Sequence, residues 1–310
     1  MALSYAQNLE DYHLSLAFAG QESGFYIDIG AGHPVADNVS FWFYERGWRG
    51  IAVEPQSQLA SLYGHIRPRD TCVSCLIGRA AGESDFYRFA RFHGLSTTSP
   101  AFAGGAAELG EAYEVVRVPT VTLAQLCEQH GVGDIDFLKI DVEGAEADVL
   151  AGNDWTRFRP KVVVAEAIML ADGSPTWAGW EPFLLDQGYT FTLFDTLNRF
   201  YVAAEQREIL DRMPRARAPW DAATHMYEIG RAPEAPHHPD HKLATDLTRA
   251  FWAALPTLEP DVLAMLVARM RGSAPADLDA LREEVQSDRF RSSLGRIACG
   301  YDGGQIADET

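Results

Sequence analysis

A short apolar run that ends in two acidic residues and a glycine constrains the fold of this chain more than any other segment. Phe137–Ile140 has the length and composition of a buried β-strand, and Asp141, Glu143 and Gly144 follow it before helical spacing resumes over residues 145–150. In an open α/β sheet, ligands bind where the ends of strands meet the starts of helices. Two acids separated by one residue repel each other there, so we infer that a function retains them.

The helix after this strand offers a simpler explanation for part of the pattern. The dipole of a helix favours acidic residues at its N-terminus, which accounts for Glu146 and for Glu143. Asp141 precedes the helix by several residues and is not explained in this way. Asp141 is therefore the first candidate for a functional residue.

Strands and helices alternate along the first 200 residues. Apolar runs bounded by glycine or proline predict strands, and stretches with helical spacing lie between them. This alternation predicts an α/β fold with a doubly wound sheet, parallel in its centre and covered by helices on both faces. The predicted strands are residues 25–30, 51–54, 72–77, 137–140 and 161–165, followed by a terminal antiparallel hairpin of residues 189–194 and 199–203.

Two capping boxes predict where helices begin. In this motif a hydroxyl accepts a hydrogen bond from the backbone three residues later, and the side chain at that later position bonds back. Ser4 with Gln7 opens the first predicted helix, over residues 5–19, and Thr122 with Gln125 opens a later one.

Residues 84–120 interrupt the alternation. Residues 85–89 and 114–118 have the pattern of edge strands, and a segment of small residues, 94–110, lies between them. A long loop of small residues inside a compact domain is typical of a binding loop or lid. A mobile insertion without a function accounts for the same composition, and both interpretations stay open.

Composition divides the chain into four parts. We predict an α/β domain over residues 1–203, a proline-rich linker over 204–240, a helical extension over 241–300 and a disordered tail over 301–310. The helical extension is a candidate for homodimerisation or for docking a partner protein.

The formal net charge of −18 argues against some partners. Such a surface repels phosphate backbones and anionic lipid headgroups, so we expect neither nucleic acid nor a membrane surface as a partner. The longest apolar run, residues 162–170, is too short and contains Glu166, so no membrane span is predicted. The absence of a secretory signal and the four scattered cysteines, expected as reduced thiols, predict a cytoplasmic location.

The first strand ends in a D-x-G-x-G pattern, with Asp28, Gly30 and Gly32 at its fixed positions. Glycines there let backbone N–H groups approach a ligand closely. An NAD-binding loop requires a third glycine where Val35 stands, so the pattern fits a compact adenosyl-amino acid better than a pyrophosphate. Glu54 ends the next strand, where its carboxylate can accept hydrogen bonds from both hydroxyls of a ribose. The position of Glu54 suits NAD and S-adenosylmethionine equally.

Three segments resemble the FkbM-type family of S-adenosylmethionine-dependent methyltransferases, namely GFYIDIGAGHP at residues 24–34, GWRGIAVEP at 47–55 and DFLKIDVEGAE at 136–146. The similarity extends over residues 4–203. It implies a Rossmann-like class I methyltransferase fold, S-adenosyl-L-methionine as cofactor, and O-methylation of a hydroxyl on a sugar, glycan or related natural product. Arg79 departs from the family pattern, which has an acidic residue there.

The predicted site residues gather at strand ends and in the loop after the first strand. Those expected to hold S-adenosylmethionine are Asp28, Gly30, Ala31, Gly32, Glu54, Pro55 and Asp141. The catalytic candidates are Asp141, Glu143 and His33, where a carboxylate acts as the general base or orients a histidine such as His33 or His225. In a second version, Asp141, Glu143 and Glu166 bind Mg²⁺, which lowers the pKa of the acceptor hydroxyl. We favour the version without metal.

Two other classes of protein stay open. An NAD-dependent oxidoreductase would share the sheet, but it needs the third glycine that this chain lacks. A non-catalytic glycan-binding relative would keep the fold and bind an acceptor sugar without turning it over.

Overall fold

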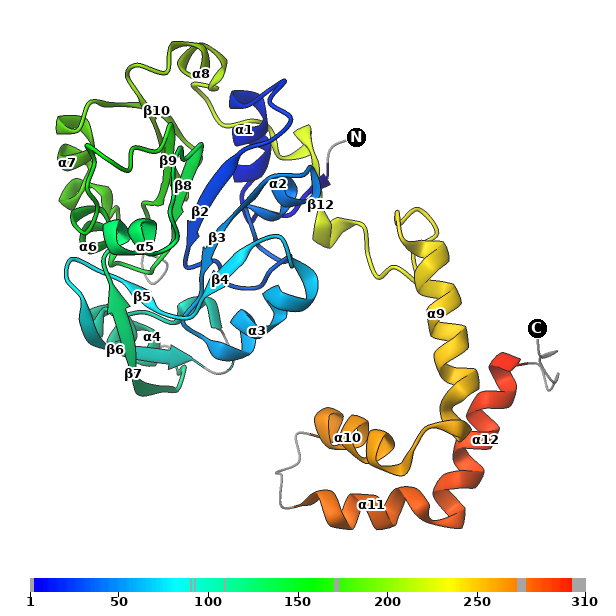
Figure 1. The fold of residues 1–310 in the computed structure, drawn as a ribbon. Helices are drawn as coiled ribbons and strands as arrows, with labels where there is room; N and C mark the ends of the chain where they lie inside the picture. Colours follow the sequence, from blue (N-terminus) through cyan, green and yellow to red (C-terminus); the bar gives the residue numbers. More distant parts are fainter. Residues whose placement is uncertain are drawn as a thin grey trace. The chain divides into compact units, whose positions relative to one another are not determined.

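The computed structural model describes residues 3–302, apart from residues 90, 92, 109, 170–172 and 272–276 (Figure 1). The chain forms two compact units, Met1–Met226 and Tyr227–Thr310. Most of the tail predicted for residues 301–310 lies outside the described residues, and residues 301 and 302 belong to the last helix.

A seven-stranded sheet forms the centre of the first unit, and its strands lie in the order β10-β11-β9-β8-β2-β3-β4. Neighbouring strands pair in parallel, except that β11 runs antiparallel to β9 and β10. The strands are β2 (Phe25–Ile29), β3 (Arg49–Val53), β4 (Thr71–Val73), β8 (Phe137–Ile140), β9 (Val162–Glu166), β10 (Tyr189–Phe194) and β11 (Asn198–Ala203). This order confirms the predicted doubly wound sheet with a terminal antiparallel hairpin, which is the class I methyltransferase fold.

Side chains alternate between the two faces of the sheet along each strand, and helices bury both faces. On β8, Leu138 and Ile140 enter one core cluster and Phe137 enters another. The first cluster is covered by α5 (Leu123–Gln129), α6 (Glu146–Ala151) and α7 (Glu181–Asp186), and the second by α1 (Glu10–Ala17), α2 (Phe41–Glu45) and α8 (Arg207–Arg212). Helix α3 (Ser57–Ile66) follows β3 and buries Tyr63 against Ala31 and Ala52, and η2 (Trp177–Gly179) precedes α7.

The insertion predicted at residues 84–120 forms a second small sheet. Its strands β6 (Gly82–Phe89) and β7 (Tyr113–Val121) join β5 (Leu76–Ile77) in the order β5-β7-β6. Both predicted segments are strands, but only β6 lies at an edge, because β7 pairs with β5 on one side and β6 on the other. The prediction of a continuous loop over residues 94–110 is wrong, because Pro100–Glu108 forms helix α4 after the short turn η1 (His93–Leu95). Proline suits the first turn of a helix and alanine favours its interior, and Ala103 and Ala106 bury against Phe89.

Of the two predicted capping boxes, one is confirmed and one is wrong. Thr122 accepts a hydrogen bond from the backbone N–H of Gln125, and the Gln125 side chain accepts one from the backbone of Thr122. Ser4 instead lies in β1 (Leu3–Ser4), and its hydroxyl donates to Asp11 Oδ1 at 2.7 Å. Helix α1 therefore starts later than predicted, at Glu10.

The first part of the predicted linker, up to Met226, belongs to the first unit. Helix α8 lies within residues 204–240 and buries Ile209 in the core, and Met213, which follows the helix, is buried there too. This burial stabilises a helix that proline spacing alone did not indicate. After η3 (Trp220–Ala222), strand β12 (Thr224–His225) pairs in parallel with β1.

The second unit is helical, as predicted. Its elements are η4 (Met226–Glu228, which spans the boundary), α9 (His241–Ala254), η5 (Leu255–Thr257), α10 (Pro260–Arg271), α11 (Leu278–Gln286) and α12 (Asp288–Asp302). Helix α9 packs against α12, and α10 packs against α11, around a small core that includes Leu263, Leu281 and Val285. None of the helices in the described part of the chain is long and apolar enough to cross a membrane.

The four cysteines are free thiols. Burial raises the pKa of Cys75 to about 11 and that of Cys72 to about 12, so neither thiol is activated for redox chemistry. The cytoplasmic location stays a prediction.

Candidate functional site

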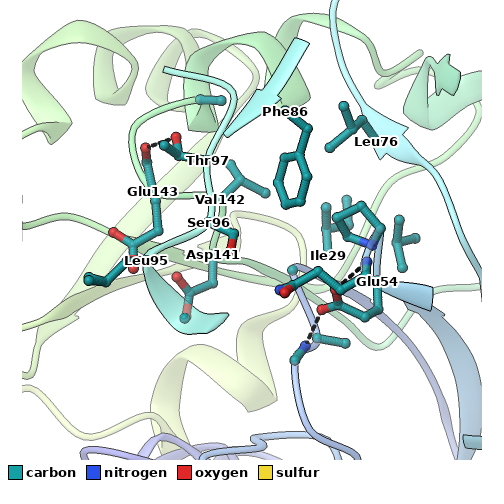
Figure 2. A pocket seen from close by; sticks show the side chains of 18 of the residues that line it. Ile29, Glu54, Leu76, Phe86, Leu95, Ser96, Thr97, Asp141, Val142 and Glu143 are labelled. Carbon is teal, nitrogen blue, oxygen red and sulfur yellow. Dashed lines mark hydrogen bonds between the residues drawn. The ribbon is translucent and has the colours of Figure 1, made fainter. Parts of the chain in front are cut away.

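A cavity of about 380 Å³ opens at the carboxyl ends of β2, β3, β8 and β9 (Figure 2). The strand order reverses at this point, because β3 and β4 lie on one side of β2 while β8 and β9 lie on the other. Such a reversal is the usual ligand position in an open α/β sheet. The predicted site residues that line it are Gly30, Ala31, Gly32, His33, Glu54, Pro55, Asp141, Glu143 and Glu166. Figure 2 shows Glu54 on one side of the cavity and Asp141 with Glu143 on the other.

The two glycines of the loop after β2 are required for different reasons. Gly30 has φ of +76°, and a Cβ there would lie 1.7 Å from the backbone oxygen of Asp141. The backbone N–H of Gly30 donates to Val53 O at 3.0 Å, which ties the loop to the end of β3. Gly32 has φ of +60° in open space, so its need for glycine is conformational.

Glu54 is held in place before any ligand binds. It is 3% exposed, and its two carboxylate oxygens accept hydrogen bonds from the backbone N–H groups of Gly32, at 2.9 Å, and Gln56, at 2.7 Å. Burial raises the pKa of Glu54 to about 7, against the lowering effect of these hydrogen bonds. The carboxylate therefore fixes the glycine loop and also faces the cavity.

Asp28 does not line the cavity, although it was predicted to contact the cofactor. It is buried, and one of its carboxylate oxygens accepts a hydrogen bond from the Ser40 hydroxyl at 2.6 Å. Arg67 donates to the same hydroxyl at 2.8 Å, so Asp28 belongs to a buried polar network behind the loop. Burial raises the pKa of Asp28, and Lys139 opposes that rise. This arrangement makes Asp28 a support for the loop.

Lys139, which the sequence interpretation did not single out, holds Asp141. Its ammonium lies 2.8 Å from Asp141 Oδ2 and is buried inside the sheet. Burial alone would lower the pKa of Lys139, but the carboxylates of Asp141 and Asp28 outweigh it and raise the pKa. A lysine within the apolar strand Phe137–Ile140 was the available sequence signal, because a buried ammonium requires acidic partners.

Glu143 stands on an unusual turn. It has φ of +52°, a left-handed conformation that is rare outside glycine, and Gly144 after it has φ of +96°. The Thr97 hydroxyl donates to the Glu143 backbone oxygen at 2.7 Å, and Glu146 Oε1 accepts from the backbone N–H groups of Gly144 and Val142. These contacts fix the direction of the Glu143 side chain.

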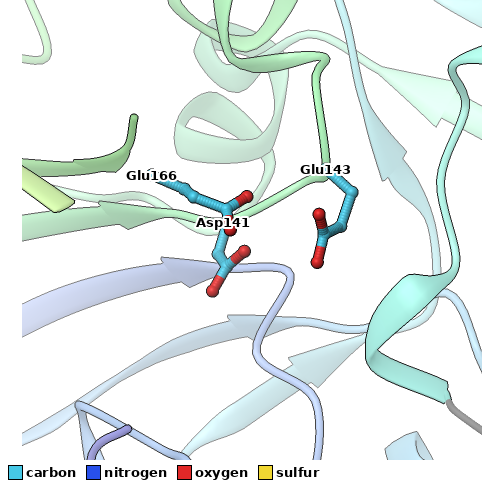
Figure 3. A group of neighbouring side chains, drawn as sticks. All are labelled: Asp141, Glu143 and Glu166. Atoms are coloured by element: carbon cyan, nitrogen blue, oxygen red, sulfur yellow. The ribbon is translucent and has the colours of Figure 1, made fainter. Parts of the chain in front are cut away.

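Asp141, Glu143 and Glu166 form an acidic cluster at one end of the cavity (Figure 3). One carboxylate oxygen from each lies within 4.8 Å of the others. Burial, with the charge of Asp141, raises the pKa of Glu143 to about 9, and the same causes raise the pKa of Glu166. The structure thus brings together the three residues that the sequence identified as potential metal ligands.

The two histidine candidates differ in position. His33 lines the cavity, and its Nδ1 accepts hydrogen bonds from the backbone N–H groups of Val35, at 3.1 Å, and Ala36, at 3.0 Å. A neutral ring bonded in this way carries its proton on Nε2, where it acts as a donor and not as a general base. His225 lies in β12, outside the cavity lining, and stacks on Trp220 with ring centroids 3.5 Å apart.

The segment after β6 forms one wall of the cavity. Residues 94–98 line it, together with the apolar side chains of Leu76 and Phe86, which sequence reasoning missed (Figure 2). Thr97 pairs with Tyr87 through two backbone hydrogen bonds, at 2.8 and 3.2 Å, so this wall is anchored to the small sheet. The position of residues 94–98 in the cavity wall supports the interpretation of this stretch as a binding loop. Arg79 lies outside this cavity and pairs with Asp148 on the surface.

The strand order and the glycine loop after β2 are those of the class I methyltransferase fold. Comparison with known proteins identifies the family. The family model described as "Methyltransferase FkbM domain" matches residues 28–191, more than half of the chain, so the chain belongs to the FkbM methyltransferase family. Among solved structures, it is similar to precorrin-6y C5,15-methyltransferase from Geobacter metallireducens GS-15, with a TM-score of 0.33 and 15% identity over 64% of this chain and 93% of that one. A search of curated proteins found no match.

Proposed function

We propose that this methyltransferase transfers the methyl group of S-adenosyl-L-methionine to a hydroxyl of a sugar, glycan or related natural product. The observation that carries the proposal is the cavity itself, with a glycine loop and Glu54 at one end and the acidic cluster at the other. Its volume of about 380 Å³ lies in the usual range for small-molecule sites.

The cofactor end would be formed by the loop after β2 and by the end of β3. The backbone of Gly30, Ala31 and Gly32 would face the amino acid portion, and Glu54, followed by Pro55, would accept the ribose hydroxyls. The Nε2 proton of His33 would be a donor toward an anionic group. In this proposal Asp141 lies between the two ends and contacts both the cofactor and the acceptor.

The acidic end would activate the acceptor. S-adenosylmethionine supplies an electrophilic methyl group on a sulfonium. Attack by the acceptor oxygen forms a C–O bond and breaks the C–S bond, which releases S-adenosylhomocysteine, while the hydroxyl proton passes to the acidic cluster. Asp141 and Glu143 would orient this hydroxyl, because alignment of nucleophile and methyl group supplies several kcal/mol of the rate enhancement.

Calorimetric titration of the whole chain with S-adenosylhomocysteine and, separately, with NADH tests the cofactor assignment. Micromolar binding of S-adenosylhomocysteine with no binding of NADH is expected, since the third glycine of an NAD loop is absent. Binding of NADH alone would overturn the proposal.

Transfer of labelled methyl groups to a panel of sugar acceptors tests the reaction. Asp141→Asn should reduce turnover strongly, while Asp148→Asn, a change at a surface ion pair, should not. Binding of acceptor and S-adenosylhomocysteine without any transfer would instead identify a non-catalytic glycan-binding relative.

The role of the helical unit stays a prediction. Helix α9 exposes Leu243, Leu247 and Phe251, which recur every four residues on one face of the helix. If this unit forms a homodimer or docks a partner protein, a chain ending at Met226 should lose that association. An unchanged oligomeric state after the truncation would argue against dimerisation.

A further inference from the structure

We propose, resting on the proposed function, that Asp141, Glu143 and Glu166 hold a hard divalent cation beside the acceptor oxygen. One oxygen from each carboxylate lies within 4.8 Å of the others. Two ligands of one ion lie at most two bond lengths apart, about 4.2 Å for Mg²⁺ and about 5 Å for Ca²⁺. The separation therefore suits a Ca²⁺-sized ion directly and Mg²⁺ after a small rotation of the side chains.

The three ligands come from positions that the fold holds in place. Asp141 follows β8, and its backbone N–H donates to Ile29 O at 3.0 Å. Glu166 ends β9 and is paired in register with Asn198 of β11. Figure 3 shows the three carboxylates converging from these separate segments. A site built on strand ends in this way is organised before the ion binds.

Glu143 provides an independent sign that a ligand belongs here. The residue is 6% exposed, and its Oε2 atom has no hydrogen-bond partner among the described residues. A buried carboxylate oxygen without a partner costs free energy, and a cation at the centre of the cluster would satisfy it. Glu146, by contrast, already accepts two backbone N–H groups and is not needed as a ligand.

The protein's own cations do not neutralise the cluster. Lys139 lies against Asp141 and is shared with the buried Asp28. Within the described residues, neither Glu143 nor Glu166 forms an ion pair. Because every candidate ligand is a carboxylate oxygen, the site favours Mg²⁺, Ca²⁺ or Mn²⁺ over metals that prefer sulfur or nitrogen.

The cluster also leaves room for the acceptor. Three protein oxygens would occupy half of an octahedral shell, and the remaining positions would face the cavity that extends to Glu54. A divalent cation there would supply Lewis acidity, which lowers the pKa of a neighbouring hydroxyl. The carboxylates would then act as ligands, as in the metal-binding version predicted from the sequence, and the hydroxyl proton would pass to solvent water instead of to the cluster. The charge of the cluster thus becomes useful to the reaction instead of repelling an ionised acceptor.

Titration with Mn²⁺, followed by electron paramagnetic resonance at 150 mM salt, tests the site directly. One saturable Mn²⁺ per chain is expected, and its affinity should fall at least tenfold in Glu143→Gln and in Glu166→Gln. The matched control Asp148→Asn should bind Mn²⁺ as the natural chain does, since Asp148 is an exposed acid paired with Arg79. No saturable binding, or binding unchanged in both glutamine variants, would overturn the proposal.

Binding of S-adenosylhomocysteine in EDTA separates this proposal from the proposed function. We expect that binding to persist in EDTA and in Glu166→Gln, which also shows that the variant is folded. Methyl transfer should stop in EDTA and return with Mg²⁺. Full activity in EDTA would refute the cation while leaving the methyltransferase assignment intact, and loss of S-adenosylhomocysteine binding in the natural chain would refute the assignment itself.

Discussion

Protonation of Glu54 should weaken cofactor binding. Both of its oxygens already accept a backbone N–H, and each must accept a further hydrogen bond if the carboxylate binds the ribose hydroxyls. A protonated carboxyl group turns one of these acceptors into a donor. With a pKa of about 7 in the free protein, roughly nine tenths of Glu54 is ionised at pH 8 and roughly one tenth at pH 6. Affinity for S-adenosylhomocysteine should therefore fall about tenfold over this range, or about 1.4 kcal/mol.

Glu54→Gln supplies the matching variant because it is neutral at every pH. Its affinity at pH 8 should be no better than that of the natural chain at pH 6, and it should not change between these values. Glu22→Gln, at an exposed acid, is the control and should keep the full pH dependence. Calorimetry at pH 6, 7 and 8 measures all three proteins, and an equal affinity of the natural chain at pH 6 and pH 8 would refute the reasoning.

Stability measurements separate lost binding from lost folding. The folded-state pKa of Glu54 is raised from 4.5 to about 7, so its stabilising contribution is complete below pH 4.5 and is lost as the pH rises through 7. The cost of ionising Glu54 in the folded protein is at most about 3 kcal/mol at pH 8. Glu54→Gln avoids this cost but leaves one of the two backbone N–H groups without its acceptor, which costs about 1–3 kcal/mol. The two effects nearly cancel, so its melting temperature at pH 8 should stay close to that of the natural chain.

Three further outcomes follow from the geometry. Gly30→Ala should destabilise the chain by at least about 3 kcal/mol, because the new Cβ collides with the backbone and φ is left-handed. Gly32→Ala has only the left-handed φ and should cost about 1 kcal/mol of strain. Equal melting temperatures of the two variants would contradict this difference. Thr122→Ala should cost about 1 kcal/mol in denaturant unfolding through loss of a helix cap, and no change would show that the cap is dispensable. Burial lowers the pKa of His13 from 6.5 to about 4, so protonation of His13 should remove up to about 3 kcal/mol of folding stability as the pH falls from 6.5 to 4. In denaturant unfolding at these pH values, His13→Gln should lose less stability than the natural chain, and His65→Gln, at an exposed histidine, should lose as much as the natural chain.

The strand ends and the cluster were predictable because their signals are local. A run of apolar residues gives the strand, and the acids that follow it must lie at the edge of a parallel sheet. Asp141 and Glu166 end neighbouring strands, so their proximity followed from the strand order of the predicted fold. Glu143 was located by its position in the chain, but its left-handed backbone gave no sign in the sequence beyond the glycine beside it.

The parts that sequence reasoning missed depend on distant contacts. Asp28 was expected in the site, but it shares the face of β2 that carries Tyr26, and its partner Ser40 comes from a later segment. The wall formed by residues 94–98 depends on the bond from Thr97 to the backbone of Glu143. Neither contact leaves a periodic pattern in the sequence, so only the three-dimensional arrangement reveals them.

The pairing of β1 with β12 limits how early during synthesis the first unit can finish folding. Leu3 is made about 220 residues before its partner Thr224. At ~5–20 residues per second, the nascent chain waits roughly 10 to 45 seconds before the two strands can meet. Strand β1 must therefore wait until most of the first unit has been made before it can pair, and that unit can complete its fold only after residue 225 has been made.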